Sequence, residues 1–216
     1  MVEYTRIRVS LKVLVDALSK LTEPQREWVR HSGFGSFLDF NITELPHRLG
    51  YKVVKSLNPA NFRLTLPGGK INITEYDVAE VLGFPHGNRP IDLTVKNQKR
   101  ADTFTDQFGL DKSKKFKVSA SMVVKAIQFD NQLTTQFKLN FMILMYNCLI
   151  ETPGTPFINK KILNFEGSLD ELSTYNWPGL VLNSLGDTKQ VWEEDPAKRM
   201  YTGPLLFLIV SLQRLF

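Results

Sequence analysis

The sequence predicts a mainly helical single domain, built around one buried central helix and carrying one small β-hairpin. Eleven of the fourteen residues 137–150 are apolar, so a helix over about residues 136–151 has almost no polar face. Residues 62–66 and 71–73 alternate apolar and polar side chains around a Pro-Gly-Gly-Lys turn, which is typical of a hairpin over about residues 62–73. Helix-capping signals separate most of the remaining apolar segments.

The first sixty residues predict three helices. An amphipathic pattern covers residues 11–21, and Thr-Glu-Pro-Gln at residues 22–25 then supplies the cap and first turn of a second helix that ends at Gly33. Residues 34–40 are apolar but favour no single state. A third helix is expected from Thr43 to Leu57, because Asn58 precedes a proline and is thereby driven out of the helical region.

The hairpin is expected to pack against the helix that follows it. Thr74 and Asp77 have the spacing of a capping box, and Gly83 ends the predicted helix. A shared inward face is predicted for the apolar side chains of both elements: Phe62, Leu64, Leu66, Ile71, Ile73, Val78 and Leu82. Burial of Leu64 and Ile73 is the test of this register.

After a loop at residues 84–90, residues 91–117 are polar and basic without a clear period, and we expect an exposed connection there. Helices are expected again over residues 119–129, over the central segment, briefly after residue 168, and from Trp177 and Pro204 onward. The last helix must either dock and bury Leu205, Phe207, Leu208 and Leu212 or leave an apolar patch exposed. We expect the second outcome, that of a truncated domain.

Composition limits the class of protein. The chain has 216 residues, 43% of them hydrophobic and 23% charged, which is typical of a globular domain. One cysteine excludes an internal disulfide and favours the cytosol or nucleus. No signal-peptide pattern opens the chain. The central apolar run has about two-thirds of the roughly 20 residues that span a bilayer, so we expect no membrane association.

No catalytic, cofactor-binding or metal-ligating set emerges from the sequence, and no small-molecule substrate is evident. Gly68, Gly69 and Lys70 lack the spacing of a phosphate loop. The three histidines, His31, His47 and His86, have no ligand partners at zinc-site spacing. Cys148 in its apolar helix, like Trp177 and Trp192, is interpreted as a core residue. Asn140 and Asn147 are interpreted as a thin solvent edge or a helix–helix hydrogen bond rather than a functional polar track.

A basic segment is the one candidate binding site. Residues 96–117 hold seven basic and three acidic groups, and the chain as a whole has a net charge of +5. The candidate nucleic-acid-binding residues are Lys96, Lys99, Arg100, Lys112, Lys114, Lys115 and Lys117. They could contact phosphates, act as a nuclear import or protein-docking signal, or form a solvated loop, and we favour the solvated loop.

Residues 62–91 also resemble a known family. Their strand, glycine-bearing turn and Ile-Thr-x-x-Asp-Val…Leu-Gly-Phe-Pro-x-Gly pattern are similar to the plant mobile domain, which carries the label "aminotransferase-like" and occurs in transposon-derived plant proteins. The motif positions are Ile73, Thr74, Asp77, Val78, Leu82, Gly83, Phe84, Pro85 and Gly87. Weaker likenesses at residues 32–38, 175–182 and 201–208 extend the resemblance over roughly residues 30–208. After residue 209 this sequence departs from the pattern of that family.

This resemblance implies a helical, non-enzymatic domain of a nuclear protein, linked to transposon biology or silencing. Protein partners are therefore expected, none of them identified. Nucleic acid bound through residues 96–117 is the alternative. A further alternative is a targeting or regulatory leader of a ubiquitin-like cysteine protease whose catalytic part is absent. Despite the label, no lysine has a convincing cofactor-binding context, so no cofactor is expected.

Overall fold

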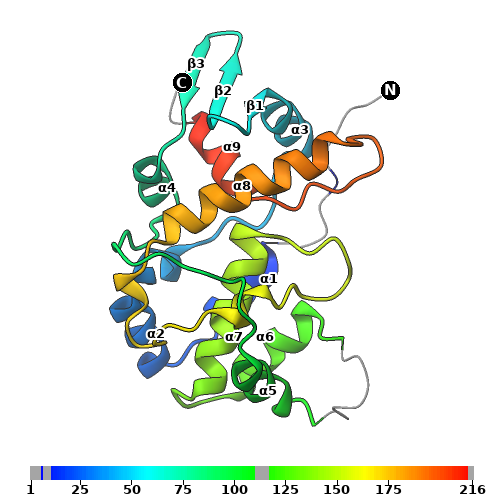
Figure 1. Ribbon diagram of the computed structural model, residues 1–216. Helices are drawn as coiled ribbons and strands as arrows, with labels where there is room; N and C mark the ends of the chain where they lie inside the picture. The colour runs from blue at the N-terminus through cyan, green and yellow to red at the C-terminus, as the bar shows by residue number, and fades with distance from the viewer. Residues whose placement is uncertain (1–5, 7–10, 110–116, 214–216) are drawn as a thin grey trace.

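A computed structural model of the chain (Figure 1) describes residue 6, residues 11–109 and residues 117–213. It confirms the predicted class, a mainly helical fold with a small antiparallel sheet. The α-helices are α1 Lys12–Leu18, α2 Glu23–Val29, α3 His47–Ser56, α4 Glu75–Leu82, α5 Gln98–Asp106, α6 Ala120–Phe129, α7 Thr135–Met145, α8 Trp177–Glu193 and α9 Leu205–Gln213. Shorter π- and 3-10-helical turns are η1 Arg30–Phe34, η2 Gly35–Asp39, η3 Tyr146–Ile150, η4 Lys161–Asn164 and η5 Leu172–Thr174.

The predicted central helix is α7 continued by η3, and it joins two groups of elements. α7 packs against α1, α5 and α6, while η3 contacts α8 and α9. In Figure 1 the sheet, α3, α4, α8 and α9 lie at one end of the molecule, and α2, α5, α6 and α7 lie at the other. Every residue from Leu139 to Ile150 is buried, as the nearly unbroken apolar sequence predicts.

The sheet has three strands in the order β1 Leu57–Asn58, β2 Arg63–Leu66 and β3 Gly69–Asn72, so the predicted hairpin gains a short third strand. Leu64 pairs with Ile71, which places both on one face. Leu64 is fully buried and Ile73 is 6% exposed, which confirms the predicted register. Phe62, Leu66 and Ile71 are partly buried at the edge of this face.

Local capping chemistry fixes several helix ends where the sequence predicted them. The amide of Thr74 donates to Asp77 Oδ2 at 2.8 Å, and the amide of Asp77 donates to Thr74 Oγ1 at 3.3 Å. Gly83 ends α4 with a φ of 65°. At α2 the amide of Thr22 donates to Gln25 Oε1, and the buried Gln25 side chain also donates to the carbonyl of Asp130, fastening α2 to the α6–α7 loop.

Two predicted boundaries are wrong. α3 begins at His47 rather than Thr43, because Pro46 keeps Leu45 out of the helical region and itself serves as the N-cap. Residues 91–117 are not irregular throughout, since residues 98–106 form α5, capped by the Asn97 side chain. Only Phe104 of α5 is buried, so the helix has too few apolar residues for its period to be visible in the sequence.

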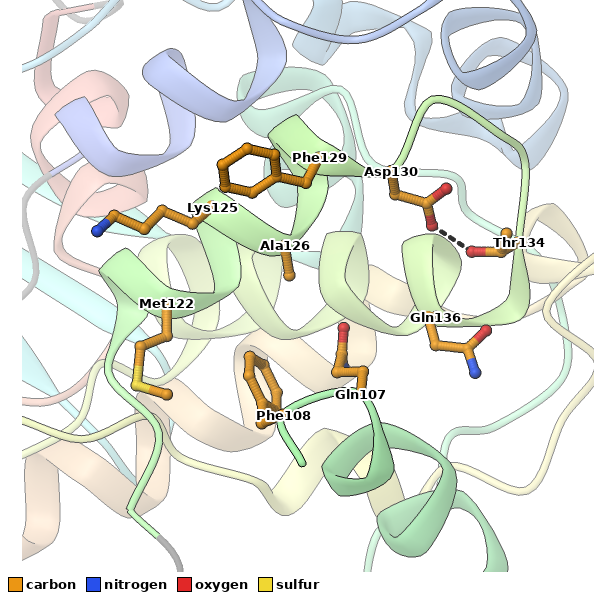
Figure 2. Close-up of a pocket in the computed structure, with 9 residues that line it drawn as sticks. All are labelled: Gln107, Phe108, Met122, Lys125, Ala126, Phe129, Asp130, Thr134 and Gln136. Carbon is orange, nitrogen blue, oxygen red and sulfur yellow. Dashed lines mark hydrogen bonds between the residues drawn. The ribbon is translucent and has the colours of Figure 1, made fainter. Parts of the chain in front are cut away.

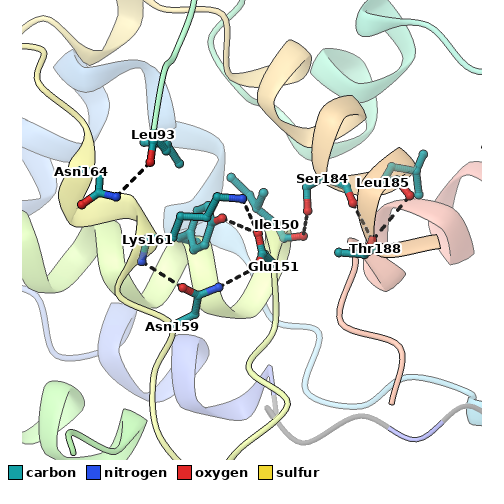
Figure 3. A network of polar contacts seen from close by, with 10 residues as sticks. Leu93, Ile150, Glu151, Asn159, Lys161, Asn164, Ser184, Leu185 and Thr188 are labelled. Carbon is teal, nitrogen blue, oxygen red and sulfur yellow. Dashed lines mark hydrogen bonds and ion pairs between the residues drawn. The ribbon is translucent and has the colours of Figure 1, made fainter. Parts of the chain in front are cut away.

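The polar side chains of the central helix, and of Glu151 after it, are used for packing, and Figure 3 shows the contact between Glu151 and Asn159. Asn140 and Gln107 exchange amide hydrogen bonds of 2.8 and 3.1 Å. Asn147 donates to the carbonyl of Asn159 at 2.9 Å and accepts from its amide at 2.6 Å. Glu151 accepts from the Tyr146 hydroxyl at 2.6 Å and the Asn159 side chain at 2.8 Å. This seam therefore holds α5 and the 151–161 segment against the helix, as the hydrogen-bond interpretation predicted.

The C-terminal helix is docked along its described length. Leu205, Phe207, Leu208 and Leu212 are all buried, and α9 packs against α3, α4 and η3. The predicted exposed patch is thus absent from the described part of α9, which has the burial expected of a docked helix.

Candidate functional site

The motif residues of the plant-mobile-domain resemblance lie in a structural joint between distant segments. Ile73, Val78 and Leu82 are buried beneath the sheet and α4. Ser36 Oγ donates to the carbonyl of Gly83 at 3.1 Å, and Phe84 packs edge-on against Phe34 and Phe37. The motif therefore joins α4 to the 34–37 turn.

The second half of the motif contacts the segment before α8. The Gly87 amide donates to the carbonyl of Tyr175 at 3.0 Å, and the His86 ring lies 3.0 Å from a Glu75 carboxylate oxygen. Asn176 donates to the same carboxylate at 2.9 Å. Pro85 packs over Gly33, where an added Cβ would lie 2.7 Å from the proline Cβ. These contacts lie within the fold, so we assign the motif a structural role rather than a catalytic one.

The basic segment is not assembled into one surface by the described residues. Lys96 and Lys99 are exposed, whereas the Arg100 guanidinium turns inward and donates to the carbonyls of Phe165 and, at 3.0 Å, Gly167. Lys117 Nζ lies 5.0 Å from the centre of the Phe157 ring. The remaining candidates, Lys112, Lys114 and Lys115, lie outside the described residues. Among the described candidates, Arg100 has a structural role.

Replacing Arg100 by glutamine is expected to lower the free energy of unfolding by about 2 kcal/mol, because two partly buried carbonyls lose a charged donor. Lys99→Gln, one residue away on the exposed side of α5, is the matched control and should change stability by less than about 0.5 kcal/mol. Urea unfolding of both variants measures the difference. Equal stabilities would contradict the structural role of Arg100.

Cys148 is buried in η3, and burial raises the pKa of its thiol to about 12. An unfolded thiol has a pKa of about 8.5, so at pH 8 the folded chain holds far less thiolate than the unfolded one. We expect Cys148 to resist a thiol-specific disulfide reagent in the native protein and to react fully in denaturant. Rapid native reaction would contradict its burial.

Because the pKa of this thiol is higher in the folded state than in the unfolded state, its burial favours the folded state at pH values below the unfolded pKa. That contribution is lost as the pH rises from about 8.5 toward the folded pKa.

No cluster of three or more His, Cys, Asp or Glu side chains within the described ranges could hold a metal ion. Within the same ranges, no helix combines the length and apolar character needed to cross a membrane.

The surface has a groove beside α6 that the sequence did not reveal (Figure 2). Its volume is about 710 Å³, and its lining residues are Gln107, Phe108, Met122, Lys125, Ala126, Phe129, Asp130, Thr134 and Gln136. Figure 2 shows Met122 and Ala126 pointing toward Phe108, with Lys125 and Phe129 farther from it, at the edge of the groove. The Phe129 side chain is 83% exposed, and nearby Leu133 is 40% exposed.

A sequence signal for this groove does exist. α6 buries Val123, Val124 and Ile127 against the core. Residues 122, 125, 126 and 129 follow the i, i+3, i+4, i+7 spacing of a second helix face, and three of them are apolar. Met122 of this second face still packs partly against the core, whereas Phe129 is left open. Which face remains open could not be decided without the positions of α1 and α7.

Comparison with protein families gives a match that covers residues 7–209. The chain belongs to the family described as a domain of unknown function, DUF8566. The DUF8566 match spans α1 to α8 and much of α9, so the groove beside α6 lies inside the family domain. No curated protein and no solved structure matches the chain. Membership of DUF8566 assigns no activity by itself, and the resemblance to the plant mobile domain stays a prediction.

Proposed function

We propose that this domain is a non-enzymatic protein-interaction module that binds its partner through the groove beside α6. The observation that carries the proposal is the 83% exposure of Phe129 at the edge of an open, partly apolar groove. Burying a phenylalanine side chain contributes about 1.5–3 kcal/mol. Exposed apolar surface of this kind marks interaction sites, and aromatic side chains dominate their energetics.

Protein is favoured over nucleic acid as the partner by the groove's lining. Phe108, Met122, Ala126 and Phe129 give it an apolar floor and edge, and Lys125 is the one lysine among the described residues that line it. A phosphate backbone is bound instead by a continuous array of cations. The described basic residues do not supply such an array, because Arg100 turns inward.

A display library of helical peptides, selected on the purified domain, tests the proposal. Selected peptides should bind the wild-type domain and lose at least tenfold in affinity for Phe129→Ser. Tyr76→Ser is the matched control, since it removes another aromatic side chain, 78% exposed, from α4. The Tyr76→Ser variant should bind the selected peptides with the affinity of the wild type. Selection of no peptide whose binding depends on Phe129 would overturn the proposed function.

A narrower element of the proposal rests on the resemblance alone: the module belongs to a plant nuclear protein related to transposon-derived genes. The chain, fused to a carrier too large to diffuse through nuclear pores, should accumulate in the nucleus of plant cells. Exclusion of the fusion from the nucleus would contradict this element and leave the interaction proposal intact.

A further inference from the structure

We infer that a small pocket between the start of α5 and the start of α7 binds one phosphate group, as free phosphate or as a phosphate monoester. The inference goes beyond the proposed function and concerns a different part of the surface. The charge of the pocket, its hydrogen-bond donors and its size lead to it.

The pocket has a volume of about 230 Å³, and the buried Leu139 lies at its base. The polar residues that line it come from the N-cap and first two turns of α5 and from the first residue of α7: Asn97, Lys99, Arg100, Thr103 and Thr135. Two of these side chains are cations, and none is a carboxylate. A lining of this kind favours an anion, which forms charge-assisted hydrogen bonds with the cations.

This charge distinguishes the pocket from three other cavities of the described chain, each of which has acidic side chains in its lining. They are Asp130 in the groove beside α6, Asp77 and Glu80 in a cavity beside β3, and Asp92, Glu166 and Glu171 in a cavity next to Arg89. An anion is therefore better accommodated at the start of α5 than in any of these three cavities.

Neither cation of the pocket is neutralised by an ion pair within the described ranges. Lys99 is exposed and has no carboxylate partner there. Arg100 donates two of its five guanidinium N–H groups to main-chain carbonyls, which fix the side chain but leave its charge uncompensated. The exposed Glu166 interacts electrostatically with Arg100 but is not among the lining residues.

Other carboxylates near the pocket already have partners. Asp102 of α5 accepts from the Gln98 side chain at 2.8 Å, and Asp170 is paired with Lys138. The positive charges of Lys99 and Arg100 are therefore the ones that remain for a ligand.

The donors of the pocket fit a phosphate group. A phosphate monoester carries about −1.5 to −2 charges at pH 7 and presents three acceptor oxygens. The Lys99 ammonium and the Thr135 hydroxyl supply donors, and so does the Asn97 amide nitrogen, since the Asn97 oxygen is used by the Arg100 main chain at 3.0 Å. The positive ends of the α5 and α7 dipoles add to this potential.

The size of the pocket limits the ligand to a single group. Its volume lies below the roughly 300–1,000 Å³ that is usual for sites that enclose a whole small molecule. Two cations likewise match one phosphate, whereas a nucleic-acid backbone needs a longer array.

Titration with inorganic phosphate at constant ionic strength, followed by amide NMR, tests the inference. The Lys99 and Thr135 amide resonances should shift in a saturable manner. Lys99→Gln should weaken phosphate binding at least fivefold, because it removes the exposed cation. Lys52→Gln, which removes the same charge from an exposed position on α3, is the matched control and should change the affinity by less than twofold.

A panel of ligands identifies the anion and its source. Acetate, with a single charge, should bind at least fivefold more weakly than phosphate. A phosphoserine peptide that binds at least as tightly as inorganic phosphate would identify a phosphorylated side chain as the ligand, and weaker binding of the peptide would identify the free ion. Both results require that the affinity falls in Lys99→Gln.

Three outcomes would overturn the inference. They are equal losses for Lys99→Gln and Lys52→Gln, acetate bound as tightly as phosphate, and a single-stranded oligonucleotide, whose phosphates are diesters, preferred over both phosphate and the phosphopeptide. Phe129→Ser should leave the phosphate affinity unchanged, so failure at this pocket is distinguishable from failure of the groove beside α6.

Discussion

Gly87→Ala is expected to lower the free energy of unfolding by about 3 kcal/mol. A Cβ at Gly87 would lie 2.1 Å from the carbonyl carbon and oxygen of Thr174 and 2.5 Å from the amide nitrogen of Tyr175. These are backbone atoms, so no side-chain rotation can relieve the overlap.

The two backbone segments that meet at Gly87 are held together by hydrogen bonds. Its amide donates to the carbonyl of Tyr175, the Arg89 amide donates to the carbonyl of Thr174, and the Asn176 amide donates to the carbonyl of Arg89 at 2.7 Å. Moving the 84–90 segment outward would break these bonds and lift Phe84 from the core. Chemical denaturation should therefore show a lower midpoint for the variant.

Gly68→Ala is the matched control for Gly87→Ala. Gly68 lies in the hairpin turn, and a Cβ there would meet nothing within 4 Å. We expect its free energy of unfolding to stay within about 0.5 kcal/mol of the wild type. Equal stabilities for the two alanine variants would show that the 84–90 and 172–177 segments are not as close as the structure places them.

Trp177→Ala is expected to cost about 4 kcal/mol of stability. The Trp177 side chain is fully buried at the start of α8, with its ring centre 5.2 Å from that of Phe34 and 5.9 Å from that of Phe165. Its indole N–H donates to the carbonyl of Leu172 at 2.8 Å. The alanine variant loses the buried area, the aromatic contacts and this hydrogen bond.

Trp177→Phe separates these contributions. It keeps an aromatic ring against Phe34 but removes the donor to Leu172, so we expect a cost of about 1–2 kcal/mol. Thermal and urea unfolding, monitored by circular dichroism, measure both variants. A Trp177→Ala domain as stable as the wild type would contradict the placement of this side chain in the core.

The sequence predicted those parts of the fold whose signals are local. Thr74 and Asp77 lie three residues apart, so their capping box needs no contact from elsewhere in the chain. The start of α8 is a local signal too, because Pro178 lies in its first turn. The alternation of apolar and polar residues was enough to predict the hairpin register, because it places Leu64 and Ile73 on the same buried face. The length of the apolar run likewise identified the central helix.

Features decided by tertiary contacts could not be predicted. α5 is held by one buried phenylalanine, the Arg100 contacts with residues 165 and 167, and the Gln107–Asn140 pair. Strand β1 is two residues that continue from α3 and pair with β2 only after the chain has turned back.

The candidate site was missed for the same reason. The sequence directed attention to the lysines of residues 96–117, whereas the groove depends on which face of α6 the core covers. Nothing in the sequence distinguishes the face with Val123, Val124 and Ile127 from the face with Met122, Ala126 and Phe129 by hydrophobicity alone.

Methyl NMR of the five methionines tests the central claim most directly, using a peptide selected on the wild-type domain. Met122 lines the groove, whereas Met142 and Met145 are buried in the central helix. The account predicts that the Met122 methyl resonance shifts in a saturable manner on titration, while those of Met142 and Met145 do not move. Binding that leaves Met122 unshifted would contradict the groove beside α6 as the interaction site.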